Sequence, residues 1–391
     1  MAPENIEMIR QSAQRALGVI KPADGNTIAD KHFLFNRKQV LTKRKLPPYY
    51  LVYFLLVDLL GFKNLGRFEK IDWSIPIDFN GKAFLLEHGK FGFGLYAHDP
   101  ESEGLAAEEI ANRVQKATKA ATPFFDHLAR QAIELSEVNV INNSIPLFCR
   151  FEFMREAYIS KYSDSVAESV LHALKIKQKN LPLGIWAFGG ANSNLKQEAN
   201  WLGISAIESF FSWTEHVLIH VAILTGSITT AREVADLAAA DWSRKFKAVF
   251  DIAGIEEKSL FDSALSLRQE LRNHIAHGAF GKGGEAFSFH SSAGAVPVLL
   301  PEKIGSKKFS LGSNLSFDYE LAFGVLDIFI LLLWSGRRAP AQLYIQGSSL
   351  PAILTFCADG TYSRAMASLA EMESLVEYLS NVADQAANMD W

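Results

Sequence analysis

The chain has 391 residues, of which 49% are hydrophobic and 21% are charged. This length predicts two or three domains, and the hydrophobic content excludes a disordered chain. The formal net charge of −4 excludes a basic field over the whole surface, so any contact with nucleic acid has to come from a local patch.

The two cysteines, Cys149 and Cys357, are too few for a disulfide framework. Both lie in apolar stretches that are typical of strands, so we expect buried free thiols and a reducing cytoplasm. The apolar stretches 49–60 and 321–334 are shorter than the ~20 residues that span a bilayer. Residues 204–224 are long enough but contain several charged or titratable side chains. We therefore expect a cytoplasmic protein without membrane contact.

The first 30 residues predict an amphipathic helix and a turn, and a basic segment follows over residues 31–45. Its cations alternate with aromatic rings, a combination that suits phosphate binding and the stacking of unpaired bases. A solvated surface strand and loop is the other interpretation. The cations are Lys31, Arg37, Lys38, Lys43, Arg44 and Lys45, and the rings are Phe33, Phe35, Tyr49 and Tyr50.

A β-hairpin is predicted around Asn80-Gly81, which joins residues 72–79 to residues 83–86. Residues 90–98 predict one more strand. The two glycines in that strand lack the Gly-Lys-Ser/Thr ending of a phosphate-binding loop, so we interpret them as strand glycines. An apolar stretch at residues 49–60 precedes the hairpin as a buried helix or strand.

The remaining elements of the first domain are mostly helical. We predict a helix over 103–137 with Ser102 as its N-cap and a break at Thr122-Pro123, a strand over 144–153, and a helix over 163–178. Hairpins among helices predict an α+β domain over residues 1–180, which would sense a trigger or position a substrate. The Pro/Gly-rich residues 181–193 are predicted to be a linker.

Helices dominate the second half of the chain. We predict helices over 194–224, 230–236, 242–250, 259–277 and 317–334, and a Gly/Ser-rich insert over 281–316 with a hairpin of 286–290 and 295–300. Residues 338–391 predict strands at 342–345 and 352–357, which would join the sheet of the first domain, and a final helix over 363–387.

The helix over 259–277 has an apolar stripe and a polar end. Leu260, Ala264, Leu267, Leu271 and Ile275 form the stripe, and Gly278 is a typical helix terminator. Near the end, Asn273 and His277 lie four residues apart on one face, and Arg272 lies on the adjoining edge. The sequence thus predicts a guanidinium, an amide and an imidazole gathered at the last turn of one helix.

This arrangement resembles the motif of the HEPN superfamily, in which an arginine beside a polar residue precedes a histidine by a few positions. The matching residues are Arg272, Asn273 and His277, with four residues between the arginine and the histidine. The order of helices over 194–337 is also similar, beginning with a long helix that holds an apolar-Glu-apolar stretch around Glu208. The insert over 281–316 departs from the family pattern.

The resemblance implies an all-α domain that cleaves RNA without a metal or other cofactor, often as a dimer and often in toxin or anti-phage systems. Such cleavage uses the ribose 2′-OH as nucleophile and needs a base, a cation and an acid. We expect His277 to transfer protons, Arg272 to bind phosphate, and Asn273 to orient the imidazole or touch phosphate. The products would carry a 2′,3′-cyclic phosphate and a 5′-OH.

Arg268, Lys282 and His274 are further candidates for substrate binding, and His274 lies too close to Arg272 for the motif. The expected partners are single-stranded RNA or tRNA, a second copy of the chain bound through the motif helix, and an inhibitory or triggering protein. The alternative function is a non-catalytic HEPN-like module that binds a protein partner or a nucleotide.

Two structural interpretations compete with the catalytic one. Arg272 would form an ion pair with Glu270 or Glu208, and His277 would cap the helix end. His216 and His220 are spaced as zinc ligands on a helix, but the order of the neighbouring glutamate does not fit a metalloprotease. We therefore predict no metal, and expect these two histidines in a core or an interface.

Overall fold

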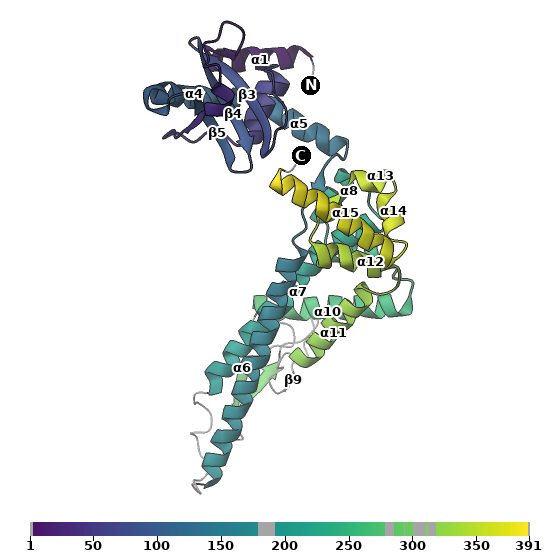
Figure 1. Cartoon of the computed structure of the whole chain (residues 1–391). Helices are drawn as coiled ribbons and strands as arrows, with labels where there is room; N and C mark the ends of the chain where they lie inside the picture. Colours follow the sequence, from purple (N-terminus) through teal and green to yellow (C-terminus); the bar gives the residue numbers. More distant parts are fainter. Residues whose placement is uncertain are drawn as a thin grey trace. The chain divides into compact units, whose positions relative to one another are not determined.

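The computed structural model describes residues 3–178, 192–277, 285–292, 294–299, 310–311 and 318–389. The chain forms two compact units, Met1–Glu137 with Glu377–Trp391, and Val138–Val376 (Figure 1). Helices and sheets are mixed, so the α+β class is confirmed. The predicted boundary at residue 180 is not where the units divide, and the predicted linker 181–193 lies mostly outside the described residues.

The first unit is built on a five-stranded antiparallel sheet with the order β1-β3-β4-β5-β2. Its strands are β1 (Ile20–Pro22), β2 (Lys38–Val40), β3 (Ile71–Phe79), β4 (Lys82–Gly89) and β5 (Gly92–Ala97). Its helices are α1 (Pro3–Leu17), α2 (Phe33–Asn36), α3 (Tyr49–Tyr53), the π-helix η1 (Phe54–Leu59), α4 (Pro100–Ala120) and α5 (Thr122–Glu134).

The predicted hairpin is confirmed as β3 and β4, with Phe79 opposite Lys82. Asn80 and Gly81 both have positive φ, 53° and 80°, which is the conformation of a type I′ turn. The helix predicted over 103–137 is confirmed as α4 and α5, broken at Thr122-Pro123. Its N-cap is Asp99 and not Ser102, because the Asp99 side chain accepts a hydrogen bond from the backbone N–H of Glu101.

One face of the sheet packs against α1, η1 and α4 to form the core of this unit. Ile75, Ile77, Phe84 and Leu86 from the central hairpin are fully buried there. Alternation along the strands turns Ser74 and Glu87 to the opposite face, where they form hydrogen bonds. Ser74 and Glu87 are 2% and 6% exposed, so the central strands are buried at this point on that face as well.

The second unit is mainly helical. Its helices are α6 (Ser144–Gln178), α7 (Asn192–Leu224), α8 (Ala231–Ala239), α9 (Trp242–Val249), α10 (Ile255–His277), α11 (Tyr319–Leu333), α12 (Ala339–Gln342), α13 (Thr355–Ala358), α14 (Thr361–Ala365) and the start of α15 (Leu369–Asn388). A 3-10 turn, η4 (Gly336–Arg338), and a π-helix, η5 (Leu343–Ser348), flank α12.

The predicted strand over 144–153 is wrong, because these residues form the first turns of α6, which packs along α7 (Figure 1). Phe148 and Phe151 are three residues apart and contact Trp213 and Phe210 of α7, with ring centroids 4.8 and 5.2 Å apart. A spacing of three or four residues buries one face of a helix, whereas a strand would send the two rings to opposite faces. The same packing places α6 in the second unit.

The cysteine expectations also need correction. Cys149 lies on α6 and is exposed, so it is neither in a strand nor buried. Cys357 lies on the short helix α13 and is half-buried. Burial raises the pKa of the Cys357 thiol to about 11, and the nearby Asp359 carboxylate adds to this.

The C-terminal strands were predicted at 342–345 and 352–357, and the structure has helix at most of these positions. Only β10 (Ala352–Ile353) remains a strand, and it pairs with β6 (Asn139–Val140) of the same unit. The prediction that these residues join the sheet of the first domain is therefore wrong.

The predicted hairpin in the insert is confirmed as β7 (Glu285–Ser291) and β8 (Gly294–Leu299), which pair antiparallel, and β9 (Ser310–Leu311) adds to β8. Within the described residues, no single helix has both the length and the apolarity to cross a membrane. Only α11 and the segment Gly336–Ser348 together reach that limit, with a bend of 74° between them.

Candidate functional site

The motif helix α10 ends at His277, the residue that the sequence predicts. Leu260, Ala264, Leu267 and Leu271 are between 1% and 6% exposed, so the predicted apolar stripe is confirmed at these four positions. The helix contacts α9 and α11. The stripe therefore anchors α10 within the bundle up to its last two turns.

The predicted catalytic residues lie in those last turns. Arg272, Asn273, His274 and His277 have helical backbone, and their side chains lie outside the described part of the chain, as does the whole of Lys282. On a helix, Asn273 and His277 share one face with a rise of about 6 Å between them. Arg272 follows Arg268 by one turn, and the contacts of Arg268 are described.

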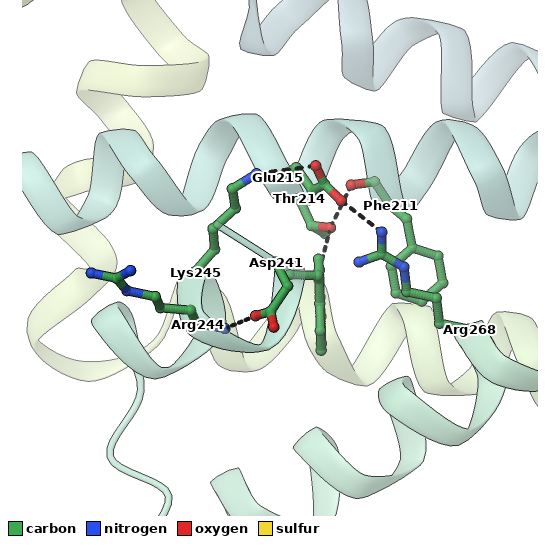
Figure 2. Close-up of polar contacts among 8 residues, drawn as sticks. Phe211, Thr214, Glu215, Asp241, Arg244, Lys245 and Arg268 are labelled. Atoms are coloured by element: carbon green, nitrogen blue, oxygen red, sulfur yellow. Dashed lines mark hydrogen bonds and ion pairs between the residues drawn. The ribbon is translucent and has the colours of Figure 1, made fainter. Parts of the chain in front are cut away.

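A polar cluster holds α10 against α7 and α9, and its centre is Glu215 (Figure 2). The two Glu215 carboxylate oxygens accept separate hydrogen bonds, one from Lys245 Nζ at 3.1 Å and one from Arg268 Nη2 at 2.8 Å. The Lys245 side chain is only 5% exposed. Because burying an ammonium group without a partner costs several kcal/mol, about 3–5 when the partner is removed, this carboxylate stabilises the junction of three helices.

The start of α9 fixes the position of Lys245 (Figure 2). The Asp241 carboxylate caps the helix by accepting a hydrogen bond from the backbone N–H of Arg244 at 2.8 Å. One residue later, Trp242 Nε1 donates to Thr214 Oγ1 at 3.0 Å, so α9 is tied to the residue next to Glu215. Lys245 follows Trp242 by three residues and therefore faces α7 as well.

Arg268 makes a second contact with α7, because its guanidinium lies 5.6 Å from the centroid of the Phe211 ring. Phe211 precedes Glu215 by one turn, so both contacts of Arg268 are on one face of α7. These contacts give Arg268 a role in positioning α10. Its side chain is 39% exposed, and phosphate binding by its remaining N–H groups stays a prediction.

Sequence reasoning missed Glu215 and Lys245. It named Glu270 or Glu208 as the ion-pair partner of Arg272, whose side chain lies outside the described part of the chain. The ion pair that the structure describes on α10 joins Arg268 to Glu215. A charged residue within an apolar helical stretch is a signal for a buried pair, and Glu215 lies in such a stretch. Lys245 lies directly before Phe246, between two inward aromatic residues, which is a similar signal.

His216 and His220 face the start of α6, with ring centroids 4.4 Å apart. His216 Nε2 accepts a hydrogen bond from the backbone N–H of Asn143 at 2.9 Å, and His220 Nδ1 lies 3.1 Å from the carbonyl oxygen of His216. Burial, with a smaller effect of His220, lowers the pKa of His216 to about 4, and burial lowers the pKa of His220 too. Both rings are therefore neutral at pH 7.

This histidine pair has the spacing but not the surroundings of a metal site. The bond from Asn143 occupies Nε2 of His216, the nitrogen that a metal would need on that side. Among the described residues, no three His, Cys, Asp or Glu side chains lie close enough together to hold a metal ion.

Comparison of the chain with protein families, curated proteins and solved structures adds no relative, because no family model, no curated protein and no solved structure matches it. The similarity to the HEPN superfamily therefore depends on residues 272–277 and on the order of the helices around them.

Proposed function

We propose that this chain is a metal-independent endoribonuclease of the HEPN type, acting in the cytoplasm as a toxin or anti-phage effector. The observation that carries the proposal is α10 itself. Four positions of its apolar stripe are packed into the bundle, and Arg272, Asn273 and His277 occur at motif spacing along its last turns. The order of α7, α9, α10 and α11 along the chain also agrees with the expected bundle.

Residues of these three types are sufficient for in-line cleavage. A base removes the proton from the ribose 2′-OH, the 2′-oxygen attacks phosphorus, and the bond from phosphorus to the 5′-oxygen breaks as an acid protonates that oxygen. In the proposal, His277 transfers protons, Arg272 stabilises the phosphorane charge, and Asn273 orients the imidazole. The products carry a 2′,3′-cyclic phosphate and a 5′-OH.

One chain supplies a single motif arginine and a single motif histidine, whereas the reaction needs both a base and an acid. A two-fold dimer that pairs the ends of two α10 helices would supply the second histidine. Such a dimer needs only one self-complementary surface. We therefore propose that the active species is a homodimer and that its substrate is single-stranded RNA or tRNA.

The test is incubation of the purified full-length protein with total RNA in EDTA. We expect cleavage with cyclic phosphate ends, and a loss of about 10²–10⁴-fold in rate for His277→Ala and for Arg272→Ala. His274→Ala decides between the two histidines, and Lys258→Ala, an exposed basic residue near the start of α10, is the matched control. The control should cleave at the rate of the unaltered chain.

Intact RNA at every protein concentration would contradict the proposal, and so would cleavage that survives in both His277→Ala and Arg272→Ala. Expression in a cell gives an independent check, because a ribonuclease should slow growth and the same two substitutions should relieve the effect. Lys258→Ala should leave the growth defect unchanged.

The alternative function, a non-catalytic helical module that binds a protein partner, is supported by the surface of α11. Leu321, Ile328 and Leu331 are 70%, 57% and 74% exposed in the described structure. Their spacing of seven and three residues puts them on one helix face. Exposed apolar side chains on one face favour a protein contact. Intact RNA together with capture of a partner that is lost in Leu331→Glu would favour this alternative.

A further inference from the structure

Aromatic side chains gather at one end of the sheet in the first unit. Strand register places Trp73 opposite His88, and His88 opposite Phe93, so three neighbouring strands present three rings at one level. The Trp73 ring lies 6.0 Å from His88 and 5.3 Å from Phe93 by ring centroids. Trp73 is buried at 4% exposure, so this row is anchored in the core.

Helix α3 extends the row to the surface. Tyr49 stacks on His88 with ring centroids 3.9 Å apart and an angle of 2° between the rings, and Tyr53 lies 5.6 Å from Trp73. The Tyr50 ring stands at 86° to that of Tyr49. Tyr49 and Tyr50 are 43% and 47% exposed. Two solvent-exposed rings are thus held nearly perpendicular to each other, which reduces the conformational entropy lost when a planar ligand binds to them.

Tyr49 lines two pockets. One has a volume of about 320 Å³ and is also lined by Tyr50, Tyr53, Asn64, Arg67 and Asp72. The other has a volume of about 370 Å³ and is also lined by Lys45, Pro47 and Phe93. These volumes are at the small end of the range for small-molecule sites, so each pocket suits one planar ring system with a substituent.

The first pocket contains fixed polar groups. Asn64 Oδ1 accepts hydrogen bonds from the backbone N–H groups of Gly66 and Ser74, at 3.0 and 3.2 Å, which orients the side-chain amide and leaves its NH₂ group as a donor. The Asp72 carboxylate also lines this pocket, as an acceptor, and pairs with Arg67 Nε at 3.3 Å. A donor and an acceptor beside stacked rings match the edge of a nucleobase.

The second pocket lies at a basic edge. Lys43, Arg44 and Lys45 are exposed, and Lys45 lines the pocket. The predicted basic segment is only partly available, because Arg37 points inward and pairs with Glu87 at 2.7 Å, and Phe33 is buried. The cation that lines the pocket together with Tyr49 is Lys45, whereas the Arg44 guanidinium donates to Asn112 Oδ1 at 2.6 Å. Lys45 favours an anionic ligand such as a phosphate.

We propose that Tyr49, Tyr50 and the two pockets form a binding site for an unpaired nucleobase that carries a phosphate. The base stacks on one of the two perpendicular tyrosine rings and contacts the other, with its polar edge toward Asn64, and the phosphate lies at Lys45. A cationic ligand is disfavoured, because Asp72 is already paired with Arg67 and Lys45 lines the second pocket. This inference goes beyond the proposed ribonuclease activity and does not depend on it.

The test is fluorescence anisotropy with a labelled 2′-O-methyl adenosine 12-mer and the full-length chain. This probe lacks the 2′-OH nucleophile, so cleavage cannot interfere with the measurement. Loss of one base–tyrosine stack should weaken binding about tenfold to a hundredfold in Tyr49→Ala and Tyr50→Ala. Tyr49→Phe keeps the ring and should bind within about threefold of the unaltered chain.

Tyr378→Ala is the matched control, since Tyr378 is 62% exposed and lines neither pocket. Lys45→Ala should reduce the slope of log affinity against log salt by about one. It also tests the site if a tyrosine variant fails to fold, which its thermal melt would show. Equal binding by Tyr49→Ala, Lys45→Ala and the control would overturn the proposal.

Competition with AMP identifies the source of the base. Displacement of the 12-mer by micromolar AMP supports a free nucleotide as ligand, and displacement by unlabelled 12-mer alone supports a single strand. The nucleobase assignment would be overturned if neither the 12-mer nor AMP binds. It would also be overturned if a proline-rich peptide displaces the 12-mer and binds Tyr49→Ala less tightly than it binds the unaltered chain.

Discussion

Each unit of the chain contains an ion pair with one well-buried partner, and the two pairs differ in which charge is the more buried. In the first unit the anion is the more buried partner, since the side chains of Glu87 and Arg37 are 8% and 18% exposed. In the second unit the cation is the more buried partner, since the side chains of Lys245 and Glu215 are 5% and 35% exposed. The group that most needs a partner is therefore the carboxylate of Glu87 in the first unit and the ammonium of Lys245 in the second.

The number of partners follows from this difference. Both Glu87 oxygens accept from Arg37 Nη2 at 2.7 Å, and Ser74, the residue opposite Glu87 in the sheet, donates to Oε2 at 2.7 Å. Lys245 Nζ has one described hydrogen bond, to Glu215. A buried charge with several donors loses one of them at moderate cost, whereas a buried charge with one partner loses its only compensation.

The largest effect is therefore expected for Glu215→Gln. This substitution leaves the Lys245 ammonium buried without an anion, and we expect a loss of about 3 kcal/mol in the free energy of unfolding, the low end of the range because Glu215 is partly exposed. Urea unfolding followed by tryptophan fluorescence measures it, because Trp213 and Trp242 lie in this unit.

Glu208→Gln is the matched control. Glu208 lies two turns before Glu215 on α7 and is exposed, so its loss should stay within about 0.5 kcal/mol. Lys245→Met removes the buried charge at similar volume. Added to Glu215→Gln, it should restore most of the stability that Glu215→Gln loses. Equal stability of the two glutamine variants would mean that the buried ammonium does not need its carboxylate.

A smaller loss is expected for Arg37→Lys in the first unit. A lysine keeps the positive charge, but its single nitrogen cannot bond both Glu87 and the Leu34 carbonyl oxygen as the two guanidinium nitrogens do, so we expect a loss of about 1.5 kcal/mol. Thermal unfolding followed by circular dichroism measures it. Arg130→Lys, at an exposed arginine on α5, should change stability by less than about 0.5 kcal/mol. A loss of 3 kcal/mol or more at Arg37 would erase the contrast between the units.

Elements with strong local signals could be predicted from the sequence. The turn at Asn80-Gly81 needs two residues that accept positive φ, and the break at Thr122-Pro123 follows from proline geometry, so a few neighbouring residues contain the information. The start of α6 could not be predicted in this way. Its aromatic and β-branched residues favour a strand locally, and the contacts of Phe148 and Phe151 with α7 decide for helix.

The candidate site was predictable in part for a related reason. Gly278 predicted the end of α10 at His277, and hydrophobic spacing identified its buried face. It could not distinguish Glu208 from Glu215, because seven residues are close to two helical turns and both lie on one face of α7. Glu215 becomes the ion-pair partner because α9 and α10 bring Lys245 and Arg268 to this position on α7. That arrangement arises only when the helices pack together.

The smallest change in the free energy of unfolding is expected for mild acidification. It tests the second unit through His216, a largely buried histidine that is neutral at pH 7. The pKa of His216 is lowered to about 4 in the folded chain, so between about pH 6.5 and 4 the unfolded chain binds more protons, and stability falls as the pH falls through this window. From pH 7 to pH 5.5, where carboxylates stay ionised, the loss should be about 1 kcal/mol or less, since the ring is partly solvated. His216→Gln removes the titrating ring and should flatten this dependence in the unfolding transition of the second unit. An unchanged slope in that variant would assign the acid sensitivity to His220, whose pKa burial also lowers, and would leave His216 without a measurable part in it.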